Sequence, residues 1–254
     1  MRIGALVTAR LKSERLPCKA LLPICGRELL AWAIERIGAM RWRLPVVVCT
    51  STLGEDDPIE ALARRCGAEC FRGDPVDVLE RLTKAADRGG FDAVVSCTAD
   101  NPLVDPASLD ALLDFHLWSG SDFSRPDGLP LGTFGYALRT TAMRRACALK
   151  ESVDTEIWGP LFSENPVFST GVLRMRSPIG PDRARLTVDT PEDLAVVTAV
   201  VERLEPLHGA GFGFGAISRL YADDPALFQA NRHVRQRQAA PGVARLRGEL
   251  PPAR

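Results

Sequence analysis

Residues 5–22, ALVTARLKSERLPCKALL, join a strand-like apolar run to a strongly basic segment. The apolar residues 3–7 predict a short buried strand, and the basic residues between 10 and 19 predict a loop. The apolar spacing of residues 29–37 then predicts a helix with one buried face. Strand, basic loop and helix in this order are typical of a phosphate-binding site, because loop amides and a helix N-terminus attract anions, to which Arg and Lys add full charges. The loop contains neither the G-x-x-x-x-G-K-[ST] motif nor the glycine cluster of dinucleotide-binding proteins.

The rest of the chain alternates predicted strands with predicted helices, joined by short loops. Strands are expected at 44–50, 69–71, 93–97 and 171–175, and helices at about 57–66, 78–86, 105–116, 140–148, 155–162 and 191–204, with a last helix starting at Asp224. This order predicts a mostly parallel α/β sheet with helices on both faces. Residues 122–138 contain several Pro and Gly and predict a small antiparallel excursion that closes over the site. We expect residues 1–237 to form one domain and residues 238–254 to form a mobile C-terminal tail.

The composition limits the partners and the compartment. Lys plus Arg and Asp plus Glu both number 32 in 254 residues, so the formal net charge is zero. This balance argues against bulk electrostatic binding to nucleic acid or to an anionic membrane. The seven cysteines are odd in number, scattered and without a C-x-x-C pair, which is typical of reduced core residues in a cytoplasmic protein. The histidines show no ligand spacing with them, so a zinc site is not expected, and no apolar run reaches membrane-spanning length.

Two acidic residues lie at the ends of predicted strands. Asp100 follows the strand at 93–97, and Asp189 ends a predicted strand in the segment from Arg185. A carboxylate at the carboxyl end of a parallel strand can hold a hard cation whose other positions are filled by substrate phosphates. Two such carboxylates facing a triphosphate would form a magnesium site for nucleotidyl transfer. The alternative for each is local: Asp100 could form only a turn before Pro102, and Asp189 could only precede a helix cap at Thr190.

The order of residues in the basic loop, A-R-x-x-S-x-R-L-P-x-K-x-L-L, resembles the nucleotide-binding signature of the cytidylyltransferases. The resemblance is strongest to the spore-coat polysaccharide cytidylyltransferase-like group, which is related to CMP-Kdo synthetase and acylneuraminate cytidylyltransferase. It implies a single-domain, Rossmann-like nucleotidyltransferase fold of the glycosyltransferase-A-like type. It also implies that the loop wraps the triphosphate of CTP, with nucleotide contacts from Ala9, Arg10, Ser13, Arg15 and Lys19. The family usually has Gly where this chain has Cys18, and a side chain there is expected to crowd the approach of a phosphate.

Three further segments resemble motifs of the same family. Residues 98–106, TADNPLVDP, are similar to T-G-D-x-P-L-I-D-P, and residues 187–194, TVDTPEDL, match T-V-D-T-P-E-D-L. The aspartates of these motifs bind magnesium in CMP-Kdo synthetase, so the implied Mg2+ ligands are Asp100 and Asp189. Residues 71–79, FRGDPVDVL, are similar to F-R-G-x-x-D-D-V-L. The implied contacts to the cytosine come from Arg72, Gly73 and Thr98.

The implied activity is that of a Mg2+-dependent cytidylyltransferase, which transfers CMP from CTP to a small acceptor and releases pyrophosphate. The residues expected to carry the chemistry are Arg10, Lys19, Asp100 and Asp189. A sugar acid is one expected acceptor, surface-polysaccharide precursor synthesis is the expected role, and a homodimer is a family expectation. The acceptor stays open, because the family's P-D-G-L-D-V-E-x-F is replaced at residues 126–134 by PDGLPLGTF, which lacks the acidic residues after Leu129.

Two other functions compete with this one. A glycosyltransferase of the A-type fold would use a finished sugar nucleotide, but it would need a D-x-D-like motif after a strand, and the sequence at Asp100 is not one. The basic loop also suits a free triphosphate better than a sugar nucleotide. The other alternative is a degenerate nucleotide-binding or scaffold protein, supported by Cys18, Ala99 and the altered segment at 128–134.

Overall fold

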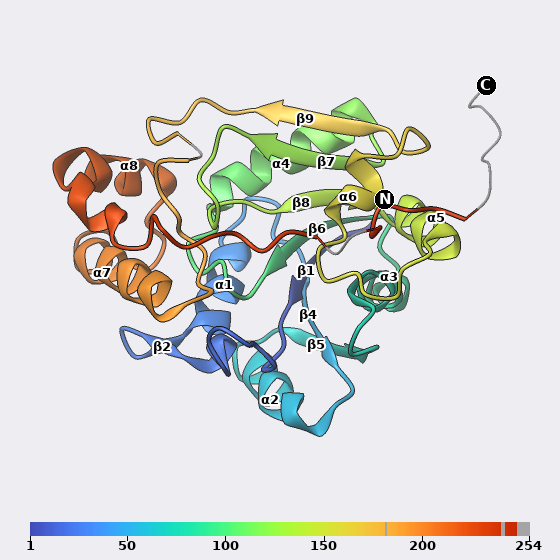
Figure 1. The fold of residues 1–254 in the computed structure, drawn as a ribbon, viewed down its shortest axis with the longest axis horizontal. Coiled ribbons are helices and arrows are strands. Elements are labelled where there is room, and N and C mark those ends of the chain that lie inside the picture. Colours follow the sequence, from blue (N-terminus) through green and yellow to red (C-terminus); the bar gives the residue numbers. More distant parts are fainter. Residues whose placement is uncertain (181, 240–241, 248–254) are drawn as a thin grey trace.

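The computed structural model describes residues 1–180, 182–239 and 242–247, and a seven-stranded sheet forms its centre (Figure 1). The strand order is β5-β4-β1-β6-β8-β7-β9. These strands are β1 (Ile3–Thr8), β4 (Val46–Ser51), β5 (Glu69–Gly73), β6 (Ala93–Thr98), β7 (Phe123–Asp127), β8 (Tyr136–Arg139) and β9 (Thr170–Arg174). Within this sheet all strands run parallel except β8, which pairs antiparallel with both β6 and β7. A separate two-stranded hairpin consists of β2 (Pro23–Ile24) and β3 (Arg27–Glu28).

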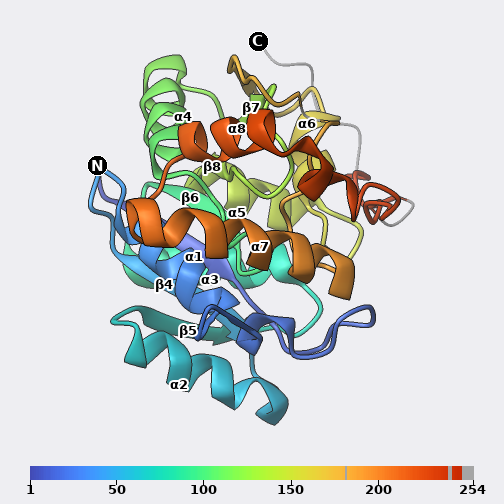
Figure 2. The ribbon, with the colours of Figure 1, turned by 90° about the vertical axis from the view of Figure 1, so that its left-hand side faces the viewer.

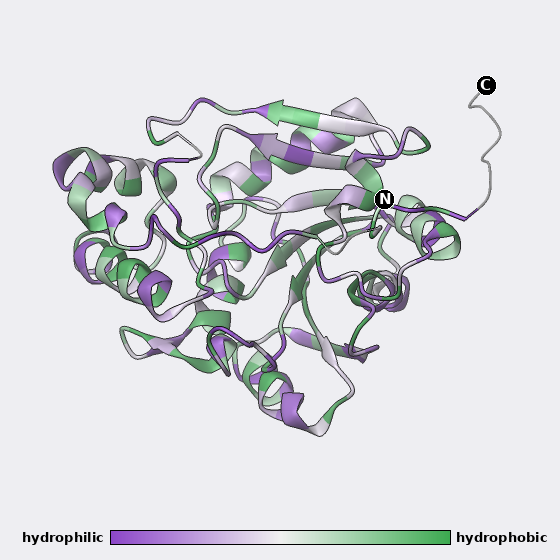
Figure 3. Cartoon of the chain, in the orientation of Figure 1, coloured by the Kyte–Doolittle hydropathy of each residue, from purple (hydrophilic) through white to green (hydrophobic). Residues whose placement is uncertain are grey.

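Helices cover both faces of the sheet, as the sequence predicts. One face carries α1 (Leu29–Gly38), α2 (Asp57–Arg65) and α4 (Pro106–Ser119), and the other carries α3 (Val78–Gly89), α5 (Thr140–Leu149) and α6 (Gly159–Ser163). Side chains alternate between the two faces along a strand. In β1, Ala5 and Val7 therefore join the first layer, whereas Leu6 joins the second. Figure 3 shows the resulting pattern, with hydrophobic central strands and helices of mixed character. The predicted α/β fold class is confirmed.

A third group of helices lies at one side of the sheet. α7 (Pro191–His208) and α8 (Phe214–Asp223) lie together (Figure 2) and share an apolar core with β2 and with Trp32 of α1. Arg36 fastens this group, because its buried guanidinium donates to the carbonyl oxygens of Val104, Ala210 and Phe212 at 2.8, 3.1 and 2.8 Å. The short 3-10 helices are η1 (Lys19–Leu21), η2 (Gly54–Asp56) and η3 (Pro225–Gln229). The last of them stands where the sequence predicts a helix from Asp224.

The segment that leads to Asp189 is not a strand of the sheet, contrary to the prediction. Residues 184–189 form only an isolated bridge, between Arg185 and Leu131. The backbone N–H of Val188 donates instead to the carbonyl oxygen of Asp100 at 2.8 Å. The apolar residues of this segment are buried in the core around α7 rather than in the sheet. The segment looks strand-like because it is apolar, but its backbone ties the turn after β6 to the start of α7.

The region before α6 and the antiparallel region also differ in detail from the prediction. The helix expected over 155–162 begins only at Gly159, because Thr155 is held to α3. Its hydroxyl accepts from the N–H of Leu79 and donates to Asp77, both at 2.8 Å. β7 and β8 are antiparallel, as predicted, but they extend the main sheet.

Part of the predicted C-terminal tail lies against the body of the protein. The chain after η3 crosses from the α7–α8 side toward α5 (Figure 1). Leu246 forms a bridge with Lys150, the Asn165 amide donates to the carbonyl oxygen of Ala244 at 2.8 Å, and Val243 is buried. These contacts place residues 242–247 beside α5 and α6, whereas the sequence predicts a mobile tail for this part of the chain. The domain boundary at residue 237 stays a prediction, and residues 240–241 and 248–254 of the tail lie outside the described residues.

Candidate active site

A cavity of about 830 Å3 opens at the carboxyl ends of β1 and β6. Its walls come from the loop after β1, the turn after β6, the segment before β8, the segment around the start of α6, and residues 236–237. Most of the predicted site residues line it, namely Ala9, Arg10, Ser13, Arg15, Lys19, Thr98, Asp100 and Asp189. Parallel strands end at the same edge of a sheet, which explains why residues so far apart in sequence meet here.

Lys19 is the centre of this site. Its ammonium donates to Asp100 Oδ2 and to Asp189 Oδ1, each at 2.7 Å, and to the carbonyl oxygen of Val188 at 3.1 Å. Burial disfavours its charged form, but the two carboxylates outweigh this, so the pKa of Lys19 is raised above its ordinary value. The two acids and the basic loop therefore converge on one point, as the sequence predicts.

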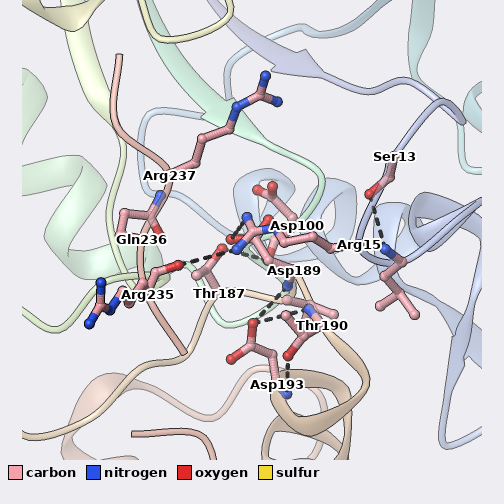
Figure 4. A network of polar contacts seen from close by, with 12 residues as sticks. Ser13, Arg15, Asp100, Thr187, Asp189, Thr190, Asp193, Arg235, Gln236 and Arg237 are labelled. Atoms are coloured by element: carbon pink, nitrogen blue, oxygen red, sulfur yellow. Dashed lines mark hydrogen bonds and ion pairs between the residues drawn. The ribbon is translucent and has the colours of Figure 1, made fainter. Parts of the chain in front are cut away.

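Asp189 is held by three cations and by its own helix cap. Its Oδ2 accepts from Arg185 at 2.6 Å and forms an ion pair with Arg15 at 3.1 Å (Figure 4). Burial alone would raise the pKa of Asp189, but Lys19, Arg15 and Arg185 lower it below its ordinary value. The carboxylate of Asp193, buried at the start of α7, accepts from the backbone N–H of Asp189 at 2.9 Å. Contacts to its side chain and to its backbone N–H thus both fix the position of Asp189.

A buried hydrogen-bond network holds the residues around Asp189, and the sequence motifs do not predict it. Arg185 Nε donates to Asp193 Oδ1 at 2.9 Å, and the Asn231 amide donates to the same oxygen at 2.7 Å. Arg185 also donates to Gln236 Oε1 at 2.6 Å. Thr190 and Asp193 form the capping box that the sequence predicts. The spacing of Arg185 and Asp189 carries a signal for their pairing, but nothing in the sequence marks Asn231 or Gln236.

The basic loop is anchored at its start and closed on itself. The backbone N–H of Leu11 donates to Asp56 Oδ1 at 2.7 Å, and Asp56 is fully buried, with its other oxygen accepting from Ser51. The N–H of Cys18 donates to the carbonyl oxygen of Leu11 at 3.0 Å, which closes the loop. Within it, Ser13 Oγ accepts from the N–H of Leu16 at 3.4 Å. The loop thus has a defined shape before any ligand binds.

Internal acids already occupy most of the cations of the site. Arg10 donates to the carbonyl oxygen of Pro75 at 2.6 Å and pairs with Glu156 at 3.6 Å, and Arg237 donates to Glu156 at 2.9 Å. The cavity has six cationic and five acidic lining residues, which are Arg10, Lys12, Arg15, Lys19, Arg125, Arg237, Glu14, Asp100, Asp154, Glu156 and Asp189. The lining is therefore nearly neutral, and four of its six cations already pair with carboxylates, namely Arg10, Arg15, Lys19 and Arg237.

The donor set around Lys19 fits a hard divalent cation. Two carboxylates meet at a point where a positive charge is already stabilised, here the Lys19 ammonium, and carboxylate oxygens are ligands that Mg2+ prefers. Among the described residues no cluster of three or more His, Cys, Asp or Glu side chains forms a metal site. The remaining positions of an Mg2+ ion at this point would fall to phosphates and water, which is usual for this ion.

Thr98 and Cys18 differ from their expected surroundings. The hydroxyl of Thr98, expected to reach the base, donates to Asp100 Oδ1 and so helps to orient this carboxylate. Cys18 has an exposed side chain that is not part of the cavity wall. Its backbone has φ 55° and ψ 23°, the left-handed conformation that Gly adopts without strain. The usual Gly therefore suits the backbone here, rather than making room for a phosphate.

Replacing Cys18 by Gly is expected to raise the free energy of unfolding by about 0.5–1 kcal/mol. The left-handed conformation costs an L-residue roughly 1–2 kcal/mol, and part of the gain is lost because Gly has more backbone freedom in the unfolded chain. Urea unfolding measures the change. Cys18→Ala is the matched control, since it keeps a Cβ on the same backbone, and it should show no gain. Equal stability of the Gly and Ala variants would show that Cys18 is not strained.

Arg72 and Gly73 lie outside the cavity wall, which differs from their expected contact with cytosine. Arg72 donates to the carbonyl oxygens of Ser51 and Leu53 at 2.9 and 2.7 Å and pairs with Asp57 at 2.6 Å. Its guanidinium thus holds the end of β4 to the start of α2. A Cβ on Gly73 would lie 2.9 Å from Phe71 and Arg81 side chains, so close packing explains this glycine.

Arg72→Leu is expected to lower the free energy of unfolding by about 1–2 kcal/mol, because two hydrogen bonds to backbone carbonyls are lost. The Michaelis constant for CTP should change less than about threefold, since the side chain has no place in the cavity wall. Urea unfolding and steady-state kinetics measure the two effects. A tenfold or larger rise in that constant, with stability unchanged, would restore the contact to the base.

Several residues of the cavity wall are not among the site residues that the sequence predicts. Phe134, Tyr136 and Trp158 form an aromatic wall, with ring centroids 5.9 and 5.6 Å apart along it. Arg125 of β7 and Arg237 after η3 add two cations. Trp158 is almost fully buried, yet it also faces the cavity. The sequence does not distinguish a residue that only packs in the core from one that is also part of the cavity wall.

Known proteins resemble this chain in sequence and in fold. A family model described as cytidylyltransferase matches residues 4–207. A spore coat polysaccharide biosynthesis protein of Bacillus subtilis is 28% identical over 205 residues, which cover 78% of this chain and 85% of that protein. A 3-deoxy-manno-octulosonate cytidylyltransferase of Geobacter sulfurreducens is 29% identical over 170 residues, which cover 66% of this chain and 64% of that protein. The structure of a cytidylyltransferase from Leptospira borgpetersenii matches with a TM-score of 0.82 at 24% identity, covering 90% of this chain and 97% of that one.

A mostly parallel α/β sheet with a basic loop and two converging aspartates defines a nucleotidyltransferase. The chain belongs to the cytidylyltransferase family, and it is a CTP-dependent nucleotidyltransferase. The family predicted from the sequence motifs is confirmed, and the A-type glycosyltransferase is disfavoured. Among the described residues, no helix has the length and apolar character needed to cross a membrane.

Proposed function

We propose that the protein transfers CMP from CTP to a sugar acid or a similar small acceptor and releases pyrophosphate. One observation carries the proposal: Lys19, from the basic loop, binds both Asp100 and Asp189 at the edge of the sheet. A loop cation and two acids at one point are the parts needed to neutralise a triphosphate during transfer. The relatives named above support the choice of CTP and of a sugar acid, and they suggest a role in surface-polysaccharide synthesis.

The proposed reaction assigns each step to residues of the cavity. The triphosphate lies along the loop, where Arg10, Arg15 and Lys19 exchange their internal acids for phosphate oxygens. A hydroxyl of the acceptor attacks the α-phosphorus in line, a P–O bond to the acceptor forms, and the bond to the pyrophosphate oxygen breaks. The acceptor's proton leaves to solvent or to a nearby carboxylate. Positioning and charge neutralisation account for the catalysis, and no covalent enzyme intermediate is involved.

Mg2+ is the proposed cofactor, held by Asp100 and Asp189 once Lys19 has moved to the phosphates. Bound there, it would neutralise charge on the phosphate oxygens during transfer. The position of Lys19 supports the exchange, because this residue already lines the cavity that would receive the phosphates. The cytoplasmic location and the homodimer stay predictions.

A pyrophosphate-release assay tests the proposal. The four nucleoside triphosphates are crossed with a panel of sugar acids and phosphorylated acceptors, in the presence and absence of Mg2+. Release that needs CTP, an acceptor and Mg2+ together is the expected result. Tight binding of CTP without turnover on any acceptor would favour the degenerate nucleotide-binding protein, and transfer from a finished sugar nucleotide would favour the glycosyltransferase.

A further inference from the structure

Arg125 is a half-buried cation of the cavity whose side chain has no partner among the described residues. Across residues 1–180, 182–239 and 242–247 its guanidinium forms no hydrogen bond and no ion pair, although it lines the cavity. By contrast Arg10, Arg15 and Arg237 each pair with a carboxylate. A partly desolvated guanidinium is costly without an acceptor, so an anion in the cavity would stabilise it.

The sheet fixes the position of Arg125. β7 is paired on both sides, with Ser124 opposite Ala137 of β8 and Arg125 opposite Val172 of β9. Arg125 alternates with Ser124 and shares the face of Phe123, which packs in the core beside α5 and α6. Since β8 and β7 follow β6 in the sheet, Arg125 lies two strands beyond Asp100, on the order of 10 Å away. The backbone of Arg125 therefore lies on the β8–β7 side of the cavity, apart from the backbone of Asp100.

The wall between these two points is aromatic. Phe134, Tyr136 and Trp158 line it, and the segment at 129–136 has no Asp or Glu. Burial raises the pKa of Tyr136, and the nearby charge of Arg125 partly offsets this rise, which agrees with their closeness. Gly135 allows the chain to approach β6, since a Cβ there would lie 2.6 Å from Cys97 Sγ. An apolar face bounded by one cation suits a ring that carries a single anionic group.

We propose that Arg125 binds the anionic group of the acceptor, while Phe134, Tyr136 and Trp158 pack against the ring of this acceptor. The inference rests on the proposed function, in which a second substrate must lie beside the CTP. The nucleotide extends from the basic loop toward Val76 and Val78, and the acceptor occupies the β8–β7 side of the same cavity. Arg125 is then the residue that selects an anionic acceptor over a neutral one.

A binding experiment tests this assignment. Two anions, 3-deoxy-manno-octulosonate for a carboxylate and mannose 1-phosphate for a phosphate, are titrated calorimetrically into protein loaded with a non-hydrolysable CTP analogue. At least one of them should bind Arg125→Gln about tenfold or more weakly than the unmodified protein, because a charge-assisted, bidentate contact is lost. Arg125→Lys should recover part of the affinity. Affinity for the CTP analogue should stay within about twofold.

The control is Arg174→Gln on the neighbouring strand β9, which removes an exposed arginine that is not part of the cavity wall. This variant should bind both anions normally. Three results would each overturn the assignment. The anions could bind Arg125→Gln and the unmodified protein equally, or neither anion could bind the unmodified protein. In the third, Arg125→Gln would lose affinity for the CTP analogue. Anion binding that depends on Arg125 in a protein without pyrophosphate release would instead retain this anion site and refute the proposed reaction.

Discussion

Lys19→Met is expected to lower the rate of pyrophosphate release by about 10²–10³-fold, the usual cost of losing one donor to a developing charge. Lys19 is the one loop cation that contacts both acids, and its pKa is raised, so it stays charged throughout the working pH range. Because this cation acts on the transition state, kcat and kcat/KM should fall together. Single-turnover and steady-state measurements of pyrophosphate release give both quantities.

The control for Lys19 is Lys84→Met, which removes an exposed lysine of α3 that pairs with Glu80 on the same helix. This variant should keep full activity. Circular dichroism and thermal unfolding must show that Lys19→Met is folded, since the change leaves two carboxylates facing each other. A folded Lys19→Met protein with normal pyrophosphate release would remove the basic loop from the active site.

Asp189→Asn is expected to have the second large effect, on both activity and stability. Pyrophosphate release should fall by at least about 10³-fold, because a ligand for the proposed Mg2+ and the partner of Lys19 are lost together. The free energy of unfolding should fall by about 2–4 kcal/mol, since the side chain is 10% exposed, Arg15 would lose its carboxylate partner and Arg185 would lose one of its two. Titration of Mg2+ against activity and urea unfolding measure these changes.

Asp100→Asn is the matched variant for Asp189. Its carboxylate is 23% exposed, and among the described cations it pairs with Lys19 alone, so activity should fall as for Asp189 while stability changes less. A normal Mg2+ requirement in either variant would refute the proposed metal position. Equal losses of stability in the two variants would contradict the role of Arg185 and Arg15 in holding Asp189.

The sequence predicts the parts of the site that strand ends and motifs define. The basic loop, Asp100 and Lys19 were found because parallel strands end at one edge of a sheet, and a loop after a strand must lie there. Asp189 lines the cavity, but the strand predicted before it is absent, because an apolar segment that fills a helical core has the same composition as a short strand.

Other parts of the site depend on contacts between distant segments. Arg72 lies within β5 rather than after a strand, Ser51, Leu53 and Asp57 bind its guanidinium, and no local pattern predicts such partners. Asn231 and Arg237 reach the site only because the chain after η3 turns back across the sheet edge. The place of Arg125 in the cavity depends on β7 lying next to β8, and the sequence does not give this order of strands.

The central claim is that Lys19 leaves Asp100 and Asp189 when the nucleotide and its metal bind. A crystal structure with Mn2+ and a non-hydrolysable CTP analogue measures this directly, because Mn2+ gives an anomalous signal. We expect that signal between the two carboxylates, with Lys19 Nζ within hydrogen-bonding distance of a phosphate oxygen. A bound nucleotide with Lys19 still on both acids, or an anomalous signal elsewhere in the protein, would contradict the exchange.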